Sequence, residues 1–386
     1  MRILHAIPSV DARSGGPIEG VKQMGAALVA MGHQVEVASL DAPGDPWAQD
    51  FPLPLHPLGP ARLGGFRYSD KWVPWLRANA SHYDAVIVDG LWQYHGFGTW
   101  RALRGTRTPY FVFTHGMLDP WFKRTYPLKH LKKWIYWPWA EYRLLRDATS
   151  VLFTCEEERL QARESFWLYR CRETVVPFGT RLPPQEGEAL RERFLAAHPE
   201  LKGKRIVLFL GRIHEKKGCD LLVSAFFQLA AQHPDLHLVL VGPDDAGAVP
   251  SFLSQARTNG LAQQVSWLGM LSGDEKWGAF HACDAFALPS HQENFGIAVA
   301  EAMGCAKPVL ISNKVNIWRE IEADGGGLVG DDTLAGTVDT LQRWLALSPA
   351  QSSAMGKQAH ATFVRRFTVE AMAQGVIDMI RKHQPA

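Results

Sequence analysis

The chain has 386 residues, of which 46% are hydrophobic and 21% are charged, a composition typical of a folded globular protein. Single hydrophobic cores stop growing at about 250–300 residues, so we expect two domains. The net charge of +2 creates no overall field that would attract nucleic acid, and we predict no nucleic-acid partner.

The five cysteines are scattered through the sequence and form no CxxC pair. This pattern argues against a disulfide framework or a zinc site and favours a reducing compartment. Residues 1–8 predict a short strand, too short for the apolar core of a signal peptide. No run reaches the roughly 18 apolar residues of a membrane span. We therefore expect a cytoplasmic protein, one that can still be peripheral at the inner face of the cytoplasmic membrane.

Short apolar runs alternate with helical patterns through the first half of the chain, which predicts parallel βαβ units. A helix is expected over 18–31, with Gly32 as its C-cap. The proline-rich segment 42–60 is predicted to be an irregular connection. The expected strands are 3–7, 34–39, 85–88, 110–114 and 150–154.

The pattern changes after Val175, where Pro183-Pro184 and the charged stretch 185–193 predict a linker. A second series of strands is then expected at 206–210, 237–241, 265–268, 285–288 and 308–311. The simplest fold is α/β with two doubly wound domains in tandem, an N-terminal one over 1–181 and a C-terminal one over 182–367. Residues 368–386 end the chain with a helical pattern, predicted over 368–382, that can pack back on either domain.

Two cations follow the first strand of the second half. The expected strand 206–210 runs into Gly211-Arg212, and Lys217 precedes the next helix. Open α/β sheets bind ligands at the carboxyl ends of their strands, and helix N-termini there favour anions. Arg212 and Lys217 therefore suit a clamp for a diphosphate. The alternative is a pair of solvated loop charges.

A second anion site is expected after the strand 285–288. Residues 295–303 predict a helix of small residues, and the amides of its first turn lack partners within the helix. Those amides belong to Phe295, Gly296 and Ile297, and we assign the neighbouring Asn294 to the same site.

Two carboxylates flank this segment, Glu293 just before the helix and Glu301 within it. Eight positions at 1.5 Å each separate them by roughly 12 Å, too far for a close acid–base pair. They could hold opposite ends of one elongated ligand, and a nucleotide-sugar has that form. The alternatives are a helix surface charge for Glu301 and a partner of the helix dipole for Glu293.

The loop Gly211-Arg212…Lys217-Gly218 and the Glu-x7-Glu segment from Glu293 to Glu301, followed by Gly304 and Pro308-Val309, resemble a family signature. The family is the retaining glycosyltransferases of family 4, also described as group 1 type. The resemblance covers nearly the whole chain. It implies the GT-B fold, in which two Rossmann-like domains face each other across an interdomain cleft.

The resemblance also implies roles for the residues. Arg212 and Lys217 would bind the donor diphosphate together with the amides of 295–297. Glu293 would bind the transferred sugar and Glu301 the ribose. The nucleotide base is expected near Met270, an assignment that rests on spacing.

The loop 14–20 after the first strand is rich in glycine but lacks the GxGxxG spacing, and no acidic residue closes the second strand before Ser39. Both features argue against a nicotinamide enzyme. Gly15 and Gly16 would let this loop cover the donor diphosphate, as the family resemblance implies for Gly16. A tight turn is the alternative.

His115 ends the strand 110–114 and is followed by glycine. Its place at a carboxyl strand end puts it at the expected interdomain cleft. Members of the family place a histidine followed by glycine here, facing the donor sugar. We predict a positioning and hydrogen-bonding group rather than a nucleophile, although most lone histidines are structural. The segment 89–92, which ends the strand 85–88, suits a structural role or an acceptor site equally.

The stretch from Trp121 to Trp139 contains five Lys or Arg residues, many aromatic residues and no acid. Basic residues with tryptophans suit an anionic membrane interface. In that case the acceptor would be lipid-linked. The alternative is a partly buried helical hairpin with an exposed basic face.

The expected reaction is transfer of a hexose, with the diphosphate as leaving group and no cofactor. The donor would be a nucleotide-diphosphate sugar such as a UDP- or GDP-hexose, and the acceptor a glycan or a polyprenyl-linked glycan in exopolysaccharide, capsule or lipopolysaccharide assembly. We assign catalytic roles to His115, Arg212, Lys217 and Glu293. Retention of configuration is implied by the family alone.

No acidic pair stands where a metal ion would be needed, because Asp244-Asp245 and Asp331-Asp332 are expected in structural turns. We therefore predict transfer without a metal. The alternatives are a nucleotide-sugar epimerase of the same two-domain architecture and a non-catalytic nucleotide- or glycan-binding protein. The intact set of Arg212, Lys217, Glu293 and Glu301 argues against the latter.

Overall fold

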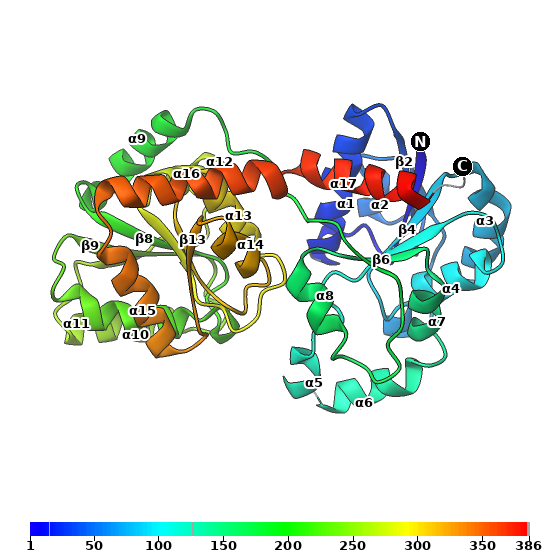
Figure 1. Cartoon of the computed structure of the whole chain (residues 1–386), viewed down its shortest axis with the longest axis horizontal. Helices are drawn as coiled ribbons and strands as arrows, with labels where there is room; N and C mark the ends of the chain where they lie inside the picture. The colour runs from blue at the N-terminus through cyan, green and yellow to red at the C-terminus, as the bar shows by residue number, and fades with distance from the viewer. Residues whose placement is uncertain (15, 126, 384–386) are drawn as a thin grey trace. The chain divides into compact units, whose positions relative to one another are not determined.

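The computed structural model describes residues 1–14, 16–125 and 127–383, which form two compact units (Figure 1). Unit 1 joins Met1–Gly179 to the chain from Val369 onward, and unit 2 is Thr180–Thr368. The predicted boundaries, 181/182 and 367/368, lie within two residues of these. The C-terminal helix α17 (Val369–His383) packs on α1 (Gly16–Ala30) within unit 1.

Unit 1 contains a parallel sheet of seven strands in the order β3-β2-β1-β4-β5-β6-β7. The bounds are β1 (Arg2–Ile7), β2 (Gln34–Ser39), β3 (Leu55–Pro57), β4 (Ala85–Asp89), β5 (Tyr110–Phe113), β6 (Ser150–Phe153) and β7 (Glu173–Val175). Since all strands run in one direction, the loops that follow them lie along one edge of the sheet.

Helices cover both faces of this sheet. Successive strand residues point to opposite faces, so Ile3 and Ile7 join the cluster under α1 and α17, whereas Leu4 and Ala6 join the other cluster. That second face carries α3 (Trp72–Asn79), α4 (Tyr94–Leu103) and α7 (Glu141–Asp147). The remaining helices are α2 (Pro46–Gln49), α5 (Trp121–Thr125), α6 (Pro127–Tyr136) and α8 (Glu156–Ala162), with 3-10 turns at Ala12–Ser14, Gly64–Phe66 and Ala80–His82.

The prediction of an irregular connection over 42–60 was wrong. This segment contains α2 and the strand β3, in which Leu55 pairs with Val37 of β2. A strand can end on Pro57 because β3 lies at the edge of the sheet, where no further strand requires the missing N–H group.

Unit 2 contains a parallel sheet of six strands in the order β10-β9-β8-β11-β12-β13. The bounds are β8 (Arg205–Leu210), β9 (Leu236–Val241), β10 (Val265–Trp267), β11 (Ala285–Leu288), β12 (Val309–Ser312) and β13 (Gly327–Gly330). Of the described strands, only β3, β7 and β13 were not predicted, and the other ten match their predicted bounds within one residue.

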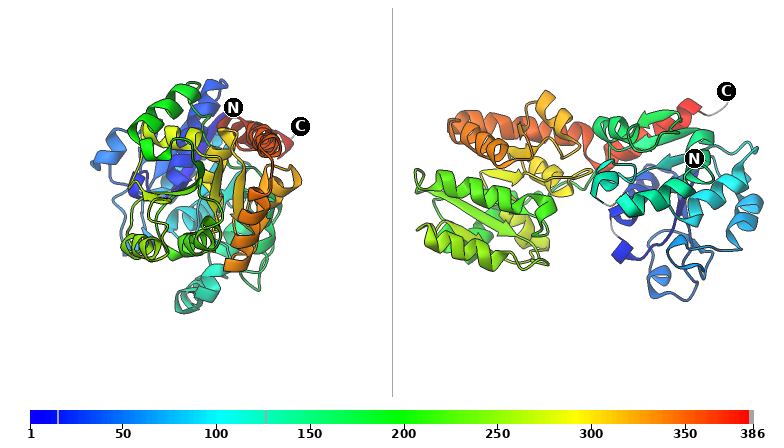
Figure 2. Two further views of the ribbon diagram at one scale, coloured as in Figure 1. Left: turned by 90° about the vertical axis from the view of Figure 1, so that its left-hand side faces the viewer. Right: turned by 90° about the horizontal axis from the view of Figure 1, so that it is seen from below.

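The helices of unit 2 also lie on both faces of its sheet (Figures 1 and 2). One face carries α10 (Cys219–Ala230), α11 (Val249–Thr258) and α15 (Leu334–Leu345). The other carries α9 (Gly187–Ala197), α12 (Gly273–Ala282), α13 (Ile297–Gly304), α14 (Trp318–Ala323) and α16 (Pro349–Arg366). Further 3-10 turns are Pro199–Leu201 and Glu215–Lys217.

The prediction of a linker over 185–193 was also wrong, because α9 begins at Gly187. Leu190 and Phe194, four residues apart, are buried on one face of α9 and pack against α12. Gly278 of α12 permits the approach, since a Cβ atom there would lie 2.7 Å from the Cβ atom of Phe194. The predicted α/β fold with two Rossmann-like domains is confirmed. Within the described residues, no helix combines the length and apolar character needed to cross a bilayer.

Candidate active site

The loops after β8 and β11 in unit 2 are in close contact and joined by hydrogen bonds. Gly218 has a φ of 67°, and a Cβ atom there would lie 2.0 Å from the carbonyl oxygen of Pro289, so only glycine fits. The hydroxyl of Ser290 and the amide of His291 both donate to the carbonyl of Lys216, each at 2.9 Å. The cationic loop is therefore held against the segment that leads to Glu293.

This contact brings two of the predicted site residues together. The ammonium group of Lys217 forms an ion pair with the carboxylate of Glu293, and both side chains are partly buried. The main chain of Glu293 is bound to the loop after β12, because its amide donates to the carbonyl of Lys314 and its carbonyl accepts from the amide of Asn316, each at 2.9 Å. Glu293 is thus positioned from both sides.

Arg212 lies in the same loop, directly after β8. Its backbone lies close to Gly242, which has a φ of 136°. A Cβ atom added at Gly242 would lie 1.8 Å from the carbonyl oxygen of Gly211. The side chain of Arg212 is exposed, and it forms no ion pair within the part of the chain that the structure describes. Its guanidinium is available to an anion at the carboxyl end of the sheet.

The predicted helix over 295–303 begins two residues later than expected. Gly296 has a φ of 75° and is the N-cap, so α13 starts at Ile297. Phe295 therefore precedes the helix, and its buried side chain packs edge-on against Phe367, with ring centroids 5.6 Å apart. The prediction that the amides of Phe295 and Gly296 belong to the first helical turn was wrong, whereas that of Ile297 does. The cause is the left-handed glycine, which turns the chain just before the helix.

Glu301 has a partner that the sequence did not reveal. The ammonium group of Lys276, in α12, lies 2.7 Å from a carboxylate oxygen of Glu301. Burial raises the pKa of Glu301, while the charge of Lys276 acts in the opposite direction. The two residues are 25 positions apart in the sequence and belong to different helices, so no spacing pattern could have paired them.

The remaining predicted donor residues lie on nearby loops. Met270 is exposed after β10, where the carbonyl of Gly269 accepts from the amide of Gly242 at 2.7 Å. The side-chain carbonyl of Asn294 accepts from the amide group of Asn316 at 3.4 Å.

The two acidic pairs make local contacts. Asp244 accepts from the amides of Ala248 and Val249 at 2.8 and 2.9 Å, at the start of α11. Asp331 accepts from the side-chain amide of Asn313, and Asp332 pairs with His291. Over residues 1–14, 16–125 and 127–383, no three His, Cys, Asp or Glu side chains are grouped so as to hold a metal ion.

In unit 1, a buried carboxylate at the end of β4 joins a histidine within β1 to a histidine that follows β5. Asp89, at the end of β4, contacts Nδ1 of His5 at 2.7 Å and Nε2 of His115 at 3.1 Å. Burial alone would raise the pKa of Asp89, but attraction to His5 and the hydrogen bonds of both imidazoles lower that pKa to about 2. From the sequence, His115 was predicted as a site residue, and the segment that begins at Asp89 was left between a structural role and an acceptor site. His5 was not predicted.

The turn that carries His115 is also held by a buried acid. Glu158 accepts from the hydroxyl of Thr114 and the amide of Gly116, both at 2.6 Å, through one carboxylate oxygen. The amide and hydroxyl of Thr154 donate to the other oxygen, at 2.7 and 2.6 Å. These bonds hold His115 at a φ of 48°, which is rare for a residue with a side chain. The backbone of His115 is therefore held by Glu158 of α8, which bridges the segments after β5 and β6.

The glycine-rich loop is only partly described. Gly15 lies outside the described residues, and Gly16 is the first residue of α1. One turn further on, a Cβ atom at Gly20 would lie 2.6 Å from the ring of Phe178, so glycine lets this ring pack against the helix. The same ring lies edge-on to His115 at 6.4 Å.

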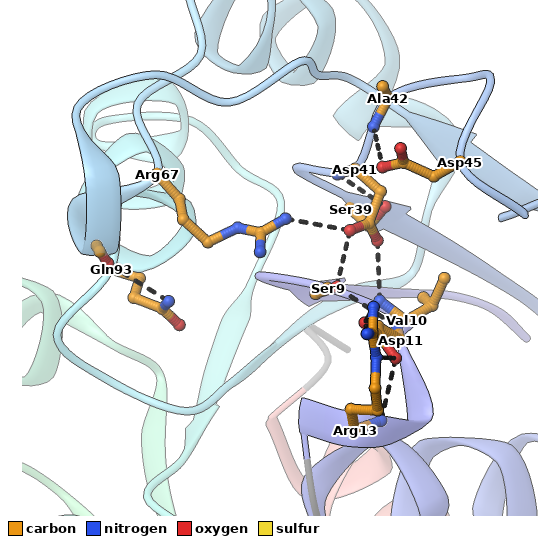
Figure 3. Close-up of polar contacts among 11 residues, drawn as sticks. Ser9, Val10, Asp11, Arg13, Ser39, Asp41, Ala42, Asp45, Arg67 and Gln93 are labelled. Carbon is orange, nitrogen blue, oxygen red and sulfur yellow. Dashed lines mark hydrogen bonds and ion pairs between the residues drawn. The ribbon is translucent and has the colours of Figure 1, made fainter. Parts of the chain in front are cut away.

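A polar cluster that the sequence did not reveal lies after β1 and β2 (Figure 3). The buried carboxylate of Asp41 accepts from the hydroxyl of Ser9 at 2.6 Å, the amide of Val10 at 2.8 Å and the guanidinium of Arg67 at 3.0 Å. Among the described residues, Nε of Arg67 is buried without a hydrogen-bond partner. This end of the sheet thus holds a positively charged donor group.

Two known solved structures share this fold. Sucrose-phosphate synthase from Thermosynechococcus elongatus superimposes with a TM-score of 0.72 at 22% identity, covering 99% of both chains. HepE of Anabaena, solved in complex with UDP, superimposes with a TM-score of 0.73 at 17% identity, covering 99% of this chain and all of its own. At these identities the likeness concerns the fold, which is that of the GT-B glycosyltransferases.

Curated relatives match part of the sequence. The D-inositol 3-phosphate glycosyltransferase of Mycolicibacterium gilvum is 34% identical over 185 residues, which is 47% of this chain and 41% of the relative. That of Rhodococcus opacus is 30% identical over 252 residues, 63% of this chain and 55% of the relative. The chain thus spans about half the length of the curated relatives it matches.

Two family descriptions match the two units. Residues 15–179 match the glycosyl transferase 4-like domain, and residues 191–362 match the glycosyl transferases of group 1. Between them they account for most of the chain and for the loops that carry Arg212, Lys217, Glu293 and Glu301. The chain therefore belongs to the group 1, family 4 glycosyltransferases with the GT-B fold.

Proposed function

We propose that this chain transfers a hexose from a nucleotide-diphosphate sugar to a glycan or lipid-linked acceptor, with retention of configuration and without a metal ion. The observation that carries the proposal is the arrangement in unit 2, where Arg212, which forms no ion pair among the described residues, lies in the same loop as Lys217 of the Lys217–Glu293 ion pair. The cellular process would be the assembly of an exopolysaccharide, a capsule or a lipopolysaccharide.

Each charged group suits one part of such a donor. The diphosphate gains negative charge as it leaves, and fixed cations that stabilise developing charge usually supply the largest catalytic effect. Arg212 and Lys217 would do so together with the first amides of α13, while Glu293 and Glu301 accept hydrogen bonds from hydroxyls of the hexose and the ribose. His115 would donate a hydrogen bond to the sugar.

The reaction itself balances within the substrates. The bond between the anomeric carbon and the phosphate oxygen breaks, and the acceptor oxygen bonds to the same face of that carbon. The departing phosphate takes the proton of the acceptor hydroxyl. The products are the glycosylated acceptor and a nucleoside diphosphate.

Known relatives support particular candidates for testing. Structures of HepE are described as complexes with UDP, with UDP and glucose, and with UDP-glucose, so a uridine donor is the first to test. The curated relatives are named for D-inositol 3-phosphate, so a phosphorylated polyol is one acceptor to include beside lipid-linked glycans.

The first experiment is a thermal-shift screen of the whole chain against UDP-, GDP- and ADP-sugars, because a ligand that binds the folded state raises its melting temperature. Turnover of the stabilising donor is then measured with and without an acceptor. Arg212→Ala should lower turnover by roughly a hundredfold and weaken donor binding. Arg257→Ala, which also removes an exposed arginine of unit 2, is the matched control and should change neither.

The other outcomes identify the rival functions. Conversion of the donor sugar into its epimer without an acceptor would identify a nucleotide-sugar epimerase. Stabilisation by a nucleotide-sugar without turnover on any acceptor would identify a binding protein. Equal turnover by Arg212→Ala and the wild type would reject the diphosphate clamp.

A further inference from the structure

Helix α6 of unit 1 has one face that packs against the rest of the unit. On that face the ring of His130 stacks on Phe166 with centroids 4.7 Å apart, and the ammonium group of Lys133 lies 4.4 Å from the ring centroid of Trp92. Trp137, one turn beyond Lys133, is fully buried and donates to the carbonyl of Leu168. These positions, spaced three and four apart, define the inner side of the helix.

The opposite face of α6 presents an apolar stripe to solvent. Leu128, Leu131 and Ile135 expose 83%, 60% and 70% of their surface. At 100° per residue these three fall within about 60° of one another, on the side away from His130 and Lys133. None of the residues of α6 is fully buried. The helix therefore exposes three large apolar side chains on the side away from His130 and Lys133.

A tryptophan pair widens this stripe. Trp134 of α6 stacks on Trp167, which follows α8, with ring centroids 5.7 Å apart, and the two are 39% and 67% exposed. Of the fourteen large hydrophobic side chains exposed in the described structure, five thus gather here, so they form a patch rather than scattered surface residues. With two exposed lysines they make up what we call the α6 outer surface: Leu128, Lys129, Leu131, Lys132, Trp134, Ile135 and Trp167.

The positive charge of this region favours an anionic lipid surface as its partner. Lys129 and Lys132 are exposed beside the apolar stripe. Residues 121–140 contain no acidic residue, and the next one along the chain, Glu141, is buried. Leucine and isoleucine enter the acyl boundary of a bilayer, tryptophan prefers the headgroup level, and lysine binds anionic headgroups. A protein partner would have to cover a convex helix, whereas a bilayer accepts one lying in its plane. Figure 1 shows α5 and α6 at the margin of unit 1, beyond the sheet, and Figure 2 shows them again from two other sides.

We propose that the α6 outer surface docks unit 1 on an anionic lipid bilayer, with α6 lying in the interface. This extends the sequence prediction, which could not divide Trp121–Trp139 into an inner and an outer set. It assigns the contact to Leu128, Leu131 and Ile135, adds Trp167 from another segment and removes Trp137. The inference does not depend on the proposed reaction, since docking needs neither donor nor acceptor.

The test is flotation of the whole chain with vesicles of phosphatidylcholine alone and with vesicles of equal parts phosphatidylglycerol and phosphatidylcholine. The chain should float with the anionic vesicles and much less with the neutral ones, and added salt should release it. The triple variant Leu128→Gln, Leu131→Gln, Ile135→Gln should lose at least about tenfold in apparent affinity. The double variant Lys129→Glu, Lys132→Glu should lose more than the roughly fivefold per site expected for removing each lysine, because the sign of the charge is reversed.

The control variants make the same kinds of substitution at exposed positions elsewhere. Val29→Gln with Met31→Gln changes exposed apolar residues at the end of α1, and Lys202→Glu with Lys357→Glu makes the same change of net charge in unit 2. Both controls should float like the wild type, and all variants should keep its melting temperature because the changed side chains are exposed.

Three results would overturn the proposal. They are equal flotation with neutral and anionic vesicles, unchanged flotation of the triple variant, and no flotation of the wild type. If sedimentation shows instead that the wild type self-associates and the triple variant does not, the surface is an interface between copies of the chain, and the bilayer is rejected as its partner.

Discussion

The ammonium group of Lys276 lies 2.7 Å from the carboxylate of Glu301, which exposes only 10% of its side chain. Burial raises the pKa of Glu301 because it disfavours the charged form, and the positive charge of Lys276 opposes this effect. An ionised carboxylate accepts hydrogen bonds through both of its oxygens, whereas a protonated carboxyl group turns one oxygen into a donor. In the proposed function, in which Glu301 binds the ribose, Lys276 would be a positioning residue that keeps the Glu301 carboxylate ionised.

Lys276→Met should raise the KM for the donor by about tenfold and leave kcat nearly unchanged, because binding of the ribose is remote from the bond that breaks. Without the cation the pKa of Glu301 rises further. As the pH is lowered, the variant should therefore lose donor affinity at a higher pH than the wild type does. The measurement is KM as a function of pH. Lys276→Arg, which keeps the charge, should restore the wild-type profile, and a Lys276→Met profile that does not move would show that the pair is only structural.

Gly218→Ala should destabilise unit 2 by roughly 2–4 kcal/mol and reduce donor binding, because the new Cβ atom meets the carbonyl oxygen of Pro289 and the residue has a positive φ. Gly203→Ala is the control, since Gly203 has a similar φ of 73° with no atom within 4 Å of the added Cβ. It should cost about 1 kcal/mol. Chemical denaturation of both variants measures the difference, and equal losses would show that the contact with Pro289 contributes nothing.

Most strands of the two sheets could be predicted from the sequence because buried parallel strands are short apolar runs between helices. The same logic placed Arg212, Lys217 and Glu293 at the carboxyl ends of strands, where the structure brings the latter two into contact. Adjacent strand ends meet even when they are far apart in the chain, and β8 and β11 are neighbours in the sheet.

What the sequence could not show depends on tertiary contacts or on a single backbone angle. His5 reads as one polar residue within an apolar strand, and only the order of β1, β4 and β5 reveals that Asp89 lies between it and His115. Lys276 meets Glu301 across two helices. The start of α13 depended on the φ of Gly296, which a run of small helix-forming residues does not disclose.

Activity should survive in excess EDTA within about twofold, because the proposed clamp neutralises the diphosphate with Arg212, Lys217 and the amides at the start of α13. The measurement is the initial rate with saturating donor and acceptor, before and after dialysis against the chelator. Loss of activity in EDTA that Mg²⁺ or Mn²⁺ restores would reject the metal-independent reaction and leave the clamp as only part of the phosphate site.

Asp89→Asn should destabilise unit 1 in a pH-dependent way. The pKa of Asp89 is lowered from 3.8 to about 2 in the folded protein, so its ionised form stabilises the fold above about pH 4, and that contribution is lost as the pH falls towards 2. A shift of this size corresponds to about 2 kcal/mol of unfolding free energy. The difference between wild type and variant should therefore be larger at pH 5 than at pH 2.

The comparison needs a control for the general effect of removing one negative charge, and Asp50→Asn serves because Asp50 is exposed in the same unit. Unfolding free energies of the three proteins from denaturant titrations at pH 5, 4, 3 and 2 measure the effect. If the Asp89→Asn difference stays constant over this range, the histidines do not stabilise the Asp89 carboxylate. His115 would then be held by Glu158 alone, through the turn from Thr114 to Gly116.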